Sequence, residues 1–241
     1  MTANLASWII MRALAVMALA ATCSGCASNE VANFQASPGQ QALVRDGIPA
    51  LVSRGQNSLV MIRAAARQFK ANGRPIFVIG IYNLSPSPQE FRLANVSVTQ
   101  TVGQQVFQIA VIPYETLVQE ERNRQVAAAL VTGLAAGANA YSAARAYRNN
   151  STASAIAQTN AARQNEAMID ATIQQGQLNL ANLERSVIKD NSLLPGEWYG
   201  GTLHLQPLAK GDERNIPRTY SISLLVGQDR HLINVVQAAV Q

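Results

Sequence analysis

Residues 75–84, which read PIFVIGIYNL, carry the clearest β-strand signal in this chain of 241 residues. The run is apolar, β-branched and aromatic, and Ser85-Pro86-Ser87-Pro88 follows it directly. Proline lacks the N–H group that a strand ladder needs, so the strand must end there. The sequence therefore predicts a β-strand with a defined end, and the rest of the fold is worked out from this strand.

Further β-strand signals lie on both sides of this run. We expect strands at 91–100, 106–112, 197–206, 219–226 and 231–236. The segment Ser58–Phe69 fits two structures, because Leu59, Ile62, Ala66 and Phe69 share one helical face, whereas Asn72-Gly73 is a strong hairpin signal. We favour the strand. Six or seven short strands are typical of an Ig-like antiparallel β-sandwich.

The region between these groups of strands has a helical composition. From Tyr114 to about Asn191 there is no proline, and alanine, glutamine and asparagine dominate. A break at 149–152, where Ser151 or Thr152 can cap a helix, divides the region into two helices. We expect an antiparallel helical hairpin at 114–191, inserted into the sandwich, so that the fold class is α+β.

A seven-residue spacing of apolar residues predicts the seam between the two helices. The second helix offers Ile169, Ile173, Gly176, Leu180, Leu183 and Val187, and the first offers Ala127, Val131, Leu134, Ala138 and Tyr141. The stretch Gln125–Ala144 is also free of charge over twenty residues and contains Gly133-x-x-x-Gly137. We favour close packing within the hairpin; contact with a membrane and packing between chains are the alternatives.

The tip of the hairpin is the predicted contact surface. Ile156 is the only large aliphatic side chain in Ser151–Gln164, so the tip has little with which to form a dry seam of its own. The nearby residues are of the types that anchor protein interfaces, namely Tyr141, Arg145, Tyr147 and Arg148. We expect an envelope protein or a second copy of the chain to bind here.

The N-terminal region resembles the signal peptide of bacterial lipoproteins. Residues 11–26 read MRALAVMALAATCSGC, in which an arginine precedes an apolar run that ends in small residues and a cysteine. The resemblance implies that 1–25 is a signal peptide, with Met11 as the expected start, and that Cys26 carries acyl chains. Ala27 in the next position implies the outer membrane, with the protein facing the periplasm.

Residues 26–57 are expected to be the lipidated cysteine and a flexible tether, because Ser37-Pro38-Gly39 and further glycines and prolines interrupt them. Residues 58–241 would then form the sandwich with its hairpin insertion. A mature chain that begins at Cys26 has no second cysteine for a disulfide, a thiolate zinc site or a cysteine nucleophile.

Positive charge is concentrated in one segment. Between Arg45 and Arg74 the chain has six basic residues and one acidic residue, which accounts for a net charge of +5. The face that Arg63, Arg67, Lys70 and Arg74 would form gives an alternative function, the binding of an anionic envelope polymer or lipid headgroup. An exported protein has no nucleic acid to bind.

Catalytic patterns are lacking. His204 and His231 are the only histidines, and a His–Asp pair with Asp212 or Asp229 is the one catalytic arrangement that the sequence offers. The chain contains no nucleophile elbow, metalloprotease helix or phosphate-binding loop. We therefore expect a structural or scaffolding protein without a cofactor or a metal, rather than an enzyme.

Overall fold

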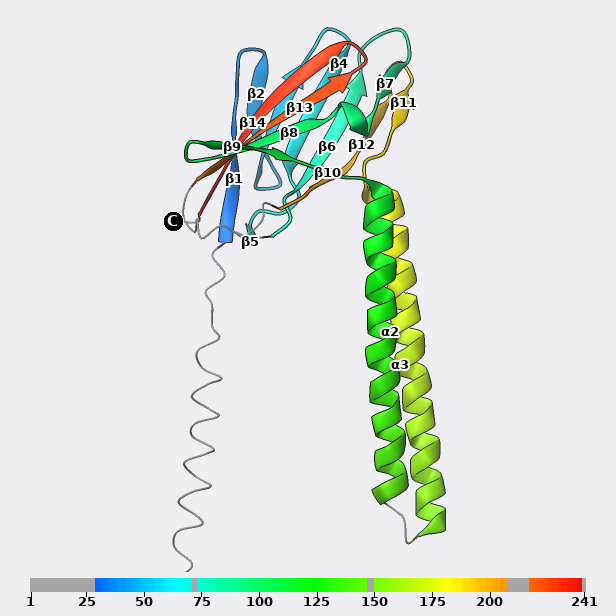
Figure 1. Cartoon of the computed structure of the whole chain (residues 1–241). Helices are drawn as coiled ribbons and strands as arrows, with labels where there is room; N and C mark the ends of the chain where they lie inside the picture. The colour runs from blue at the N-terminus through cyan, green and yellow to red at the C-terminus, as the bar shows by residue number, and fades with distance from the viewer. Residues whose placement is uncertain (1–28, 71–72, 147–149, 208–216, 240–241) are drawn as a thin grey trace, which may run out of the picture.

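The computed structural model describes residues 29–70, 73–146, 150–207 and 217–239. They form an α+β fold in which two antiparallel sheets make an open β-sandwich and two long helices project from one end of it (Figure 1). The predicted class is thus confirmed at the level of a β-sandwich with helices.

The first sheet has eight strands. Its main path runs through β11 (Asn191–Leu193), β7 (Gln89–Phe91), β13 (Arg218–Val226), β14 (Asp229–Ala239), β1 (Asn29–Gln35) and β5 (Phe69–Lys70). From this path β8 (Ser97–Val102) also pairs with β13, and β9 (Gln105–Ile109) pairs with β8.

The second sheet has six strands. Their order is β10 (Val111–Ile112), β12 (Trp198–Leu205), β6 (Ile76–Asn83), β4 (Ser58–Ala64), β3 (Ile48–Arg54) and β2 (Gln40–Arg45). A single turn of 3-10 helix, Leu93–Asn95, connects β7 to β8. The described residues contain fourteen strands, more than the six or seven expected. β1, β2, β3, β5 and β11 were not predicted as separate strands, and the signals at 91–100 and 106–112 divide into shorter pieces.

The core lies between the two sheets. Along β6 every second residue is buried, with Phe77, Ile79 and Ile81 at most 1% exposed. Side chains of the opposite sheet, including Ile222 and Val235, complete this core. On the outer face of β6, Tyr82 packs against Trp198 with ring centroids 4.9 Å apart. The apolar run at 75–84 is therefore a central strand, buried on its inner face and half-buried on its outer face.

The preference for a strand at Ser58–Phe69 is confirmed for its first seven residues, which are β4. This strand pairs antiparallel with β6, with Ala64 opposite Phe77. The connection between the two strands is longer than a two-residue Asn-Gly turn and includes β5.

The prediction of a tether at 26–57 was wrong for the described part of that segment. β1, β2 and β3 occupy most of it and are integral strands of the sandwich, with Leu51 fully buried. The breakers are turns between paired strands: Gly39 (φ 81°) follows β1, and Asp46 (φ 53°) with Gly47 (φ 72°) joins β2 to β3. Two successive positive φ values are the geometry of a two-residue hairpin turn.

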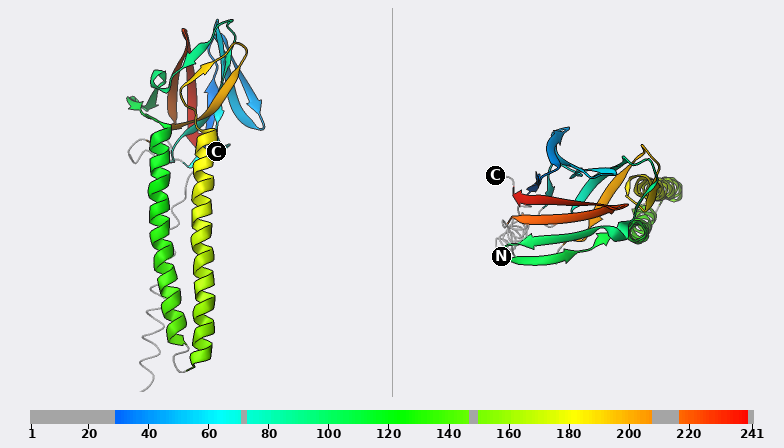
Figure 2. Two further views of the ribbon diagram at one scale, coloured as in Figure 1. Left: turned by 90° about the vertical axis from the view of Figure 1, so that its right-hand side faces the viewer. Right: turned by 90° about the horizontal axis from the view of Figure 1, so that it is seen from above.

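The helices are inserted where the chain passes from one sheet to the other. α2 (Tyr114–Ala146) follows β10, and α3 (Ser151–Ser186) precedes β11. They lie side by side and antiparallel along their whole length (Figures 1 and 2). The residue that caps α3 is Asn150 rather than Ser151 or Thr152, and its side chain accepts a hydrogen bond from the Ala153 N–H at 3.1 Å.

The predicted apolar seam was wrong for α2 and only partly right for α3. Val131, Leu134 and Tyr141 are more than 60% exposed, whereas Gly176, Leu183 and Val187 do face the seam. The residues that face α3 are Leu117, Glu121, Gln125, Ala128, Thr132, Ala136, Asn139 and Ala143. Those that face α2 are Ala157, Ala161, Asn165, Met168, Thr172, Gly176, Asn179, Leu183 and Val187. Both rows follow a spacing of four, four and three, an eleven-residue repeat, which favours a slight right-handed twist in place of the left-handed supercoil of a heptad.

Candidate interaction surface on the helical hairpin

Hydrogen bonds between side chains hold the two helices together. Gln125 donates to the backbone carbonyl of Gly176 at 2.9 Å, and Thr132 lies 3.3 Å from Thr172 between hydroxyl oxygens. We call this row of contacts the polar seam. The close approach at its upper part needs Gly176, because a Cβ atom there would lie 2.6 Å from Cδ of Gln125.

The polar seam continues to both sides of this contact. Asn139 donates to Asn165 at 3.3 Å, and Asn165 donates to the carbonyl of Ala136 at 3.0 Å. Nearer the sandwich, the buried carboxylate of Glu121 accepts from Asn179 at 2.8 Å and forms an ion pair with Arg124. The amide and hydroxyl side chains of α2 between Gln125 and Asn139 thus all face its partner helix.

The apolar side chains of α2 face away from the hairpin as a consequence. We call this surface the α2 outer face; its large members are Val126, Leu130, Val131, Leu134 and Tyr141, which are 62–77% exposed. Gly133 and Gly137 belong to it as well, since a Cβ atom at either position would meet nothing within 4 Å. The small-residue pattern therefore does not serve packing within the hairpin, which corrects the interpretation we had favoured.

The outer surface of α3 has a different composition. Arg163, Glu166 and Asp170 are exposed on it, together with several glutamines. Ile169 and Ile173 are 43% and 53% exposed on one side of the helix. Ile156 and Leu178 are also exposed on α3, at 58% and 59%. The surface of α3 is thus mostly polar and charged with scattered apolar residues, whereas that of α2 over 125–144 is uncharged and mostly apolar.

The residues predicted for partner contact lie partly on this surface. Tyr141 belongs to the α2 outer face, and Arg145, one turn further on, lies 3.4 Å from its hydroxyl and is also exposed. Tyr147 and Arg148 lie outside the described residues, as does Cys26. Sequence reasoning assigned Leu134 to the seam and did not single out Val126 or Leu130, because the heptad spacing selected a different row of α2.

The base of the hairpin is tied to the sandwich by a group of polar contacts. The hydroxyl of Tyr114 donates to Glu184, and the ammonium of Lys189 lies 2.5 Å from the same carboxylate and 4.0 Å from the centre of the Tyr114 ring. Hydrogen bonds from Lys189 and Tyr114 hold the pKa of Glu184 below its usual value. Gly201 of β12 allows the end of α3 to approach, since a Cβ atom there would lie 2.7 Å from the carbonyl oxygen of Ser186.

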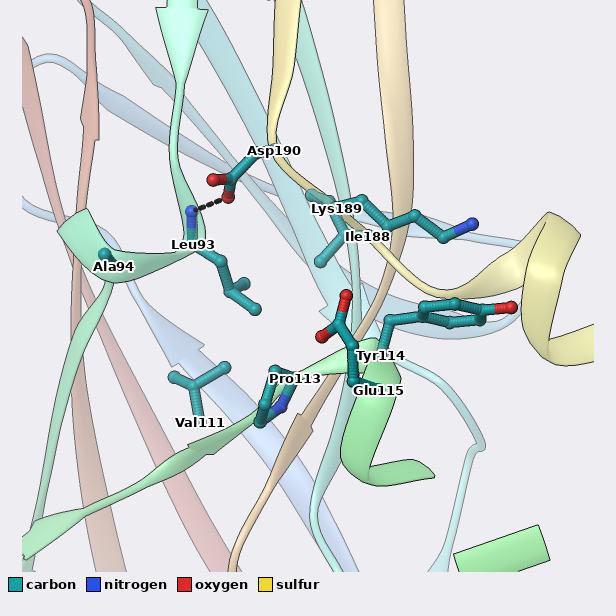
Figure 3. A pocket seen from close by; sticks show the side chains of 9 residues that line it. All are labelled: Leu93, Ala94, Val111, Pro113, Tyr114, Glu115, Ile188, Lys189 and Asp190. Carbon is teal, nitrogen blue, oxygen red and sulfur yellow. Dashed lines mark hydrogen bonds between the residues drawn. The ribbon is translucent and has the colours of Figure 1, made fainter. Parts of the chain in front are cut away.

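An open hollow of about 500 Å³ lies beside this base (Figure 3). Its apolar side includes Leu93, Val111 and Pro113, while the carboxylates of Glu115 and Asp190 border it. Asp190 accepts a hydrogen bond from the N–H of Leu93 at 2.7 Å, so this carboxylate already serves to hold the loop. The hollow separates the first turn of α2 from the sandwich, and its polar groups are engaged in structure.

The four basic residues of the alternative site come from different elements of the sandwich. Arg63 lies on β4 of one sheet, whereas the backbone of Lys70 belongs to β5 of the other. Arg67 donates to the carbonyl of Gly47 at 3.3 Å. Arg74 forms two hydrogen bonds with Glu120, at 2.9 and 3.0 Å, which neutralise its charge.

His231 and Asp229, one of the pairs that the sequence offered, are brought together through Ser58 in a largely buried cluster. The hydroxyl of Ser58 donates to Asp229 at 2.7 Å and lies 2.9 Å from Nε2 of His231, while Nδ1 of His231 lies 3.0 Å from the hydroxyl of Ser53. A hydroxyl has one proton, so Ser58 accepts from Nε2 and His231 cannot act as its base in this arrangement. Ser58 and His231 are at most 1% exposed, and the cluster joins the two sheets.

The other titratable groups point to structure as well. His204 lies 3.1 Å from the Thr202 hydroxyl and is half-buried, and burial lowers its pKa. Asp212 lies outside the described residues. Among the described residues, no cluster of three or more histidine, cysteine, aspartate or glutamate side chains could hold a metal ion.

Within the part of the chain that the structure describes, α2 is the one helix long and apolar enough to cross a membrane, and none of its most apolar window is buried.

Comparisons with protein-family models, with curated proteins and with solved structures found no match for this chain. The hairpin surface is therefore interpreted from its own chemistry.

Proposed function

We propose that this protein is a non-catalytic, lipid-anchored component of a bacterial cell envelope whose helical hairpin is a protein-contact surface. The observation that supports it is the α2 outer face, on which five large apolar side chains are 62–77% exposed. Soluble proteins rarely leave an apolar surface of this length uncovered, and such surfaces mark interaction sites. In this proposal the sandwich is a rigid base and the hairpin is the element that reaches a partner.

The difference between the outer surfaces of the two helices favours a contact surface on α2 over a hairpin that is apolar throughout. α3 presents Arg163, Glu166 and Asp170 to solvent, as the outer side of a water-exposed helix does. α2 has no charged residue between Arg124 and Arg145. A helix that keeps its polar residues for its partner and turns its apolar residues outward is suited to a second contact on the outside.

The cellular location is proposed from the sequence resemblance. Acyl chains on Cys26 would hold the protein at the outer membrane, facing the periplasm. The finer description of the sandwich as Ig-like, with the strand connections of that class, belongs to this proposal too. Neither point enters the argument for the α2 outer face, which depends on the hairpin alone.

Binding of an anionic polymer is the weaker proposal. It needs Arg63, Arg67, Lys70 and Arg74 on one surface, but Arg74 is ion-paired with Glu120, and the others are spread over two sheets. We therefore do not develop it further.

Photo-crosslinking in intact cells tests the proposed function. A photoreactive phenylalanine analogue replaces Tyr141 on the α2 outer face, and the control carries it at Gln174 on the exposed side of α3. We expect a discrete crosslinked protein, either another envelope protein or the chain itself, from position 141 and little from position 174. No adduct from position 141, and none from Val131 as a second position, would refute a protein-contact role.

A further inference from the structure

The α2 outer face is wider than one helix can cover. At about 100° per residue, its apolar and small residues extend from Ala129 through Leu130 and Leu134 to Ala135, over about two thirds of the helix circumference. A helix that packs on a single neighbour needs an apolar stripe of roughly 100°. The width of the surface therefore calls for two or more neighbouring helices in addition to α3.

The chemistry of the surface suits protein helices better than lipid. Besides its five large side chains it consists of alanine, glycine and the exposed Ser142, small residues that gain little on transfer to hydrocarbon but allow helix backbones to approach closely. Gly133 and Gly137 leave open space where a neighbouring side chain can enter.

The position of α3 also counts against a bilayer. Asn165 and Thr172 contact Asn139 and Thr132, so Glu166 and Asp170 lie at the level of the α2 outer face. Immersion of the hairpin would bring these exposed charges into the hydrocarbon, where each costs about 2.5–3.5 kcal/mol on insertion scales. The apolar surface of α2 and the charged residues of α3 need different surroundings, and both needs are met if protein covers α2 while α3 stays in water.

We propose that the α2 outer face binds the α2 helices of further copies of this chain, in a closed bundle of three or more hairpins. The α2 helices lie inside the bundle and the α3 helices form its wetted outside. This inference rests on the proposed function and names the partner. An uncharged surface carries no repulsion between identical copies, and anchorage in one membrane would give all copies the same orientation.

The size of the contact favours a ring over a pair. The uncharged stretch Gln125–Ala144 is about 30 Å long and the helix about 10–12 Å wide, which gives about 300–360 Å² per copy in one contact. A pair would bury about 600–720 Å², less than the roughly 1,200 Å² of a stable interface. In a ring of three, each copy makes two such contacts and buries about 600–720 Å² of its own surface, twice what it buries in a pair.

A charge placed on the α2 outer face tests the inference. The full chain, purified from membranes in a mild detergent, is compared as wild type, as Leu134→Glu and as Gln174→Glu, a matched charge on α3. Leu134 is 77% exposed in the single chain, so its replacement leaves the hairpin intact, which circular dichroism at 222 nm verifies. We expect a mass of three or more chains by light scattering for the wild type and for Gln174→Glu, and one chain for Leu134→Glu.

Cysteine crosslinking in intact cells supplies the second measurement. Leu134→Cys is expected to give disulfide-linked dimers on mild oxidation and Gln174→Cys is not, with the wild-type chain as the background for its own Cys23 and Cys26. Dimers from Gln174→Cys alone would place α3 inside the assembly and overturn the arrangement.

A wild-type mass of one chain without dimers from Leu134→Cys would overturn self-association. If the probe at Tyr141 then still captures a different protein, the proposed function stands with a heterologous partner. If that probe captures nothing, both proposals fail.

Discussion

Three glycines of the hairpin give a pair of opposite predictions for the same substitution. Gly133 and Gly137 lie on the α2 outer face with open space at the Cβ position, whereas Gly176 lies in the polar seam against Gln125. None of the three has a positive φ, so alanine fits the backbone at each of them. Glycine in a helix interior is about 0.8–1.0 kcal/mol less favourable than alanine.

The double variant Gly133→Ala, Gly137→Ala should therefore stabilise the hairpin by about 1.6–2.0 kcal/mol. Gly176→Ala has the same gain in helix propensity, but its Cβ would lie 2.6 Å from Cδ of Gln125 and displace the 2.9 Å hydrogen bond to the Gly176 carbonyl. Overpacking costs about 1–3 kcal/mol and a lost hydrogen bond about 0.5–1.5 kcal/mol. The net effect at this position should be a loss of about 1–3 kcal/mol.

Hydrogen exchange of the α2 amides measures these effects, because local opening of a helix sets its exchange rate. Both sets of variants are made in the Leu134→Glu background, so that contacts between copies do not contribute. We expect exchange about 15- to 30-fold slower for the double variant and faster for Gly176→Ala. Equal effects of the same sign at the two places would refute the assignment of Gly176 to the seam and of Gly133 and Gly137 to the outside.

Two further predictions concern the sandwich. Burial lowers the pKa of His231 below 6.5, although Asp229 opposes the shift, so the contribution of the neutral imidazole to stability is present above about pH 6.5 and is lost as the pH falls below this value. Urea unfolding should therefore give a smaller free energy of unfolding at about pH 5 than at about pH 7.5. Equal values would contradict the buried cluster. Gly201→Ala should lower the free energy of unfolding by about 1–3 kcal/mol, because its Cβ would meet the backbone at Ser186. The control is Gly80→Ala, which should leave the free energy of unfolding nearly unchanged, because its Cβ would meet the nearest atom at 3.6 Å.

Local signals in the sequence were sufficient for the strong strand and for the extent of the helices. The run at 75–84 is apolar enough to be recognised alone, and the proline-free segment beginning at Tyr114 contains both helices. Asp46-Gly47 carried an equally local hairpin signal, flanked by Val44 and Ile48, but it was interpreted as a breaker in a tether. The strands β1 to β3 were missed because a flexible linker and a series of turns between strands are both rich in glycine and proline, so composition alone does not distinguish them.

The arrangement of the hairpin could not be obtained from apolar periodicity. Apolar periodicity assumes that the apolar residues of a helix are the buried ones, and it therefore selected Val131 and Leu134, which are exposed, as the inner face. The inner face instead consists of alanine and glycine with side chains such as Thr132 and Asn139, whose hydrogen-bond partners are on the other helix. A search for polar residues at a seven-residue spacing would have found it, because Gln125, Thr132 and Asn139 follow that spacing on α2, as Asn165, Thr172 and Asn179 do on α3. The cluster around His231 was inaccessible for another reason, since Ser58 and Asp229 are 171 positions apart in the chain.

The place where β1 begins has a consequence for how copies would meet. β1 begins, and pairs with β5, on the lower side of the sandwich in Figure 1, the side toward which the hairpin also points. If Cys26 is acylated, three residues lead from the lipid to Asn29, a reach of about 10 Å at most. The start of β1 would then stay within about 10 Å of the bilayer surface, and encounters between copies would be a two-dimensional search within a thin layer. Confinement of this kind raises the effective concentration, so a contact too weak to persist among freely diffusing chains would persist at the membrane.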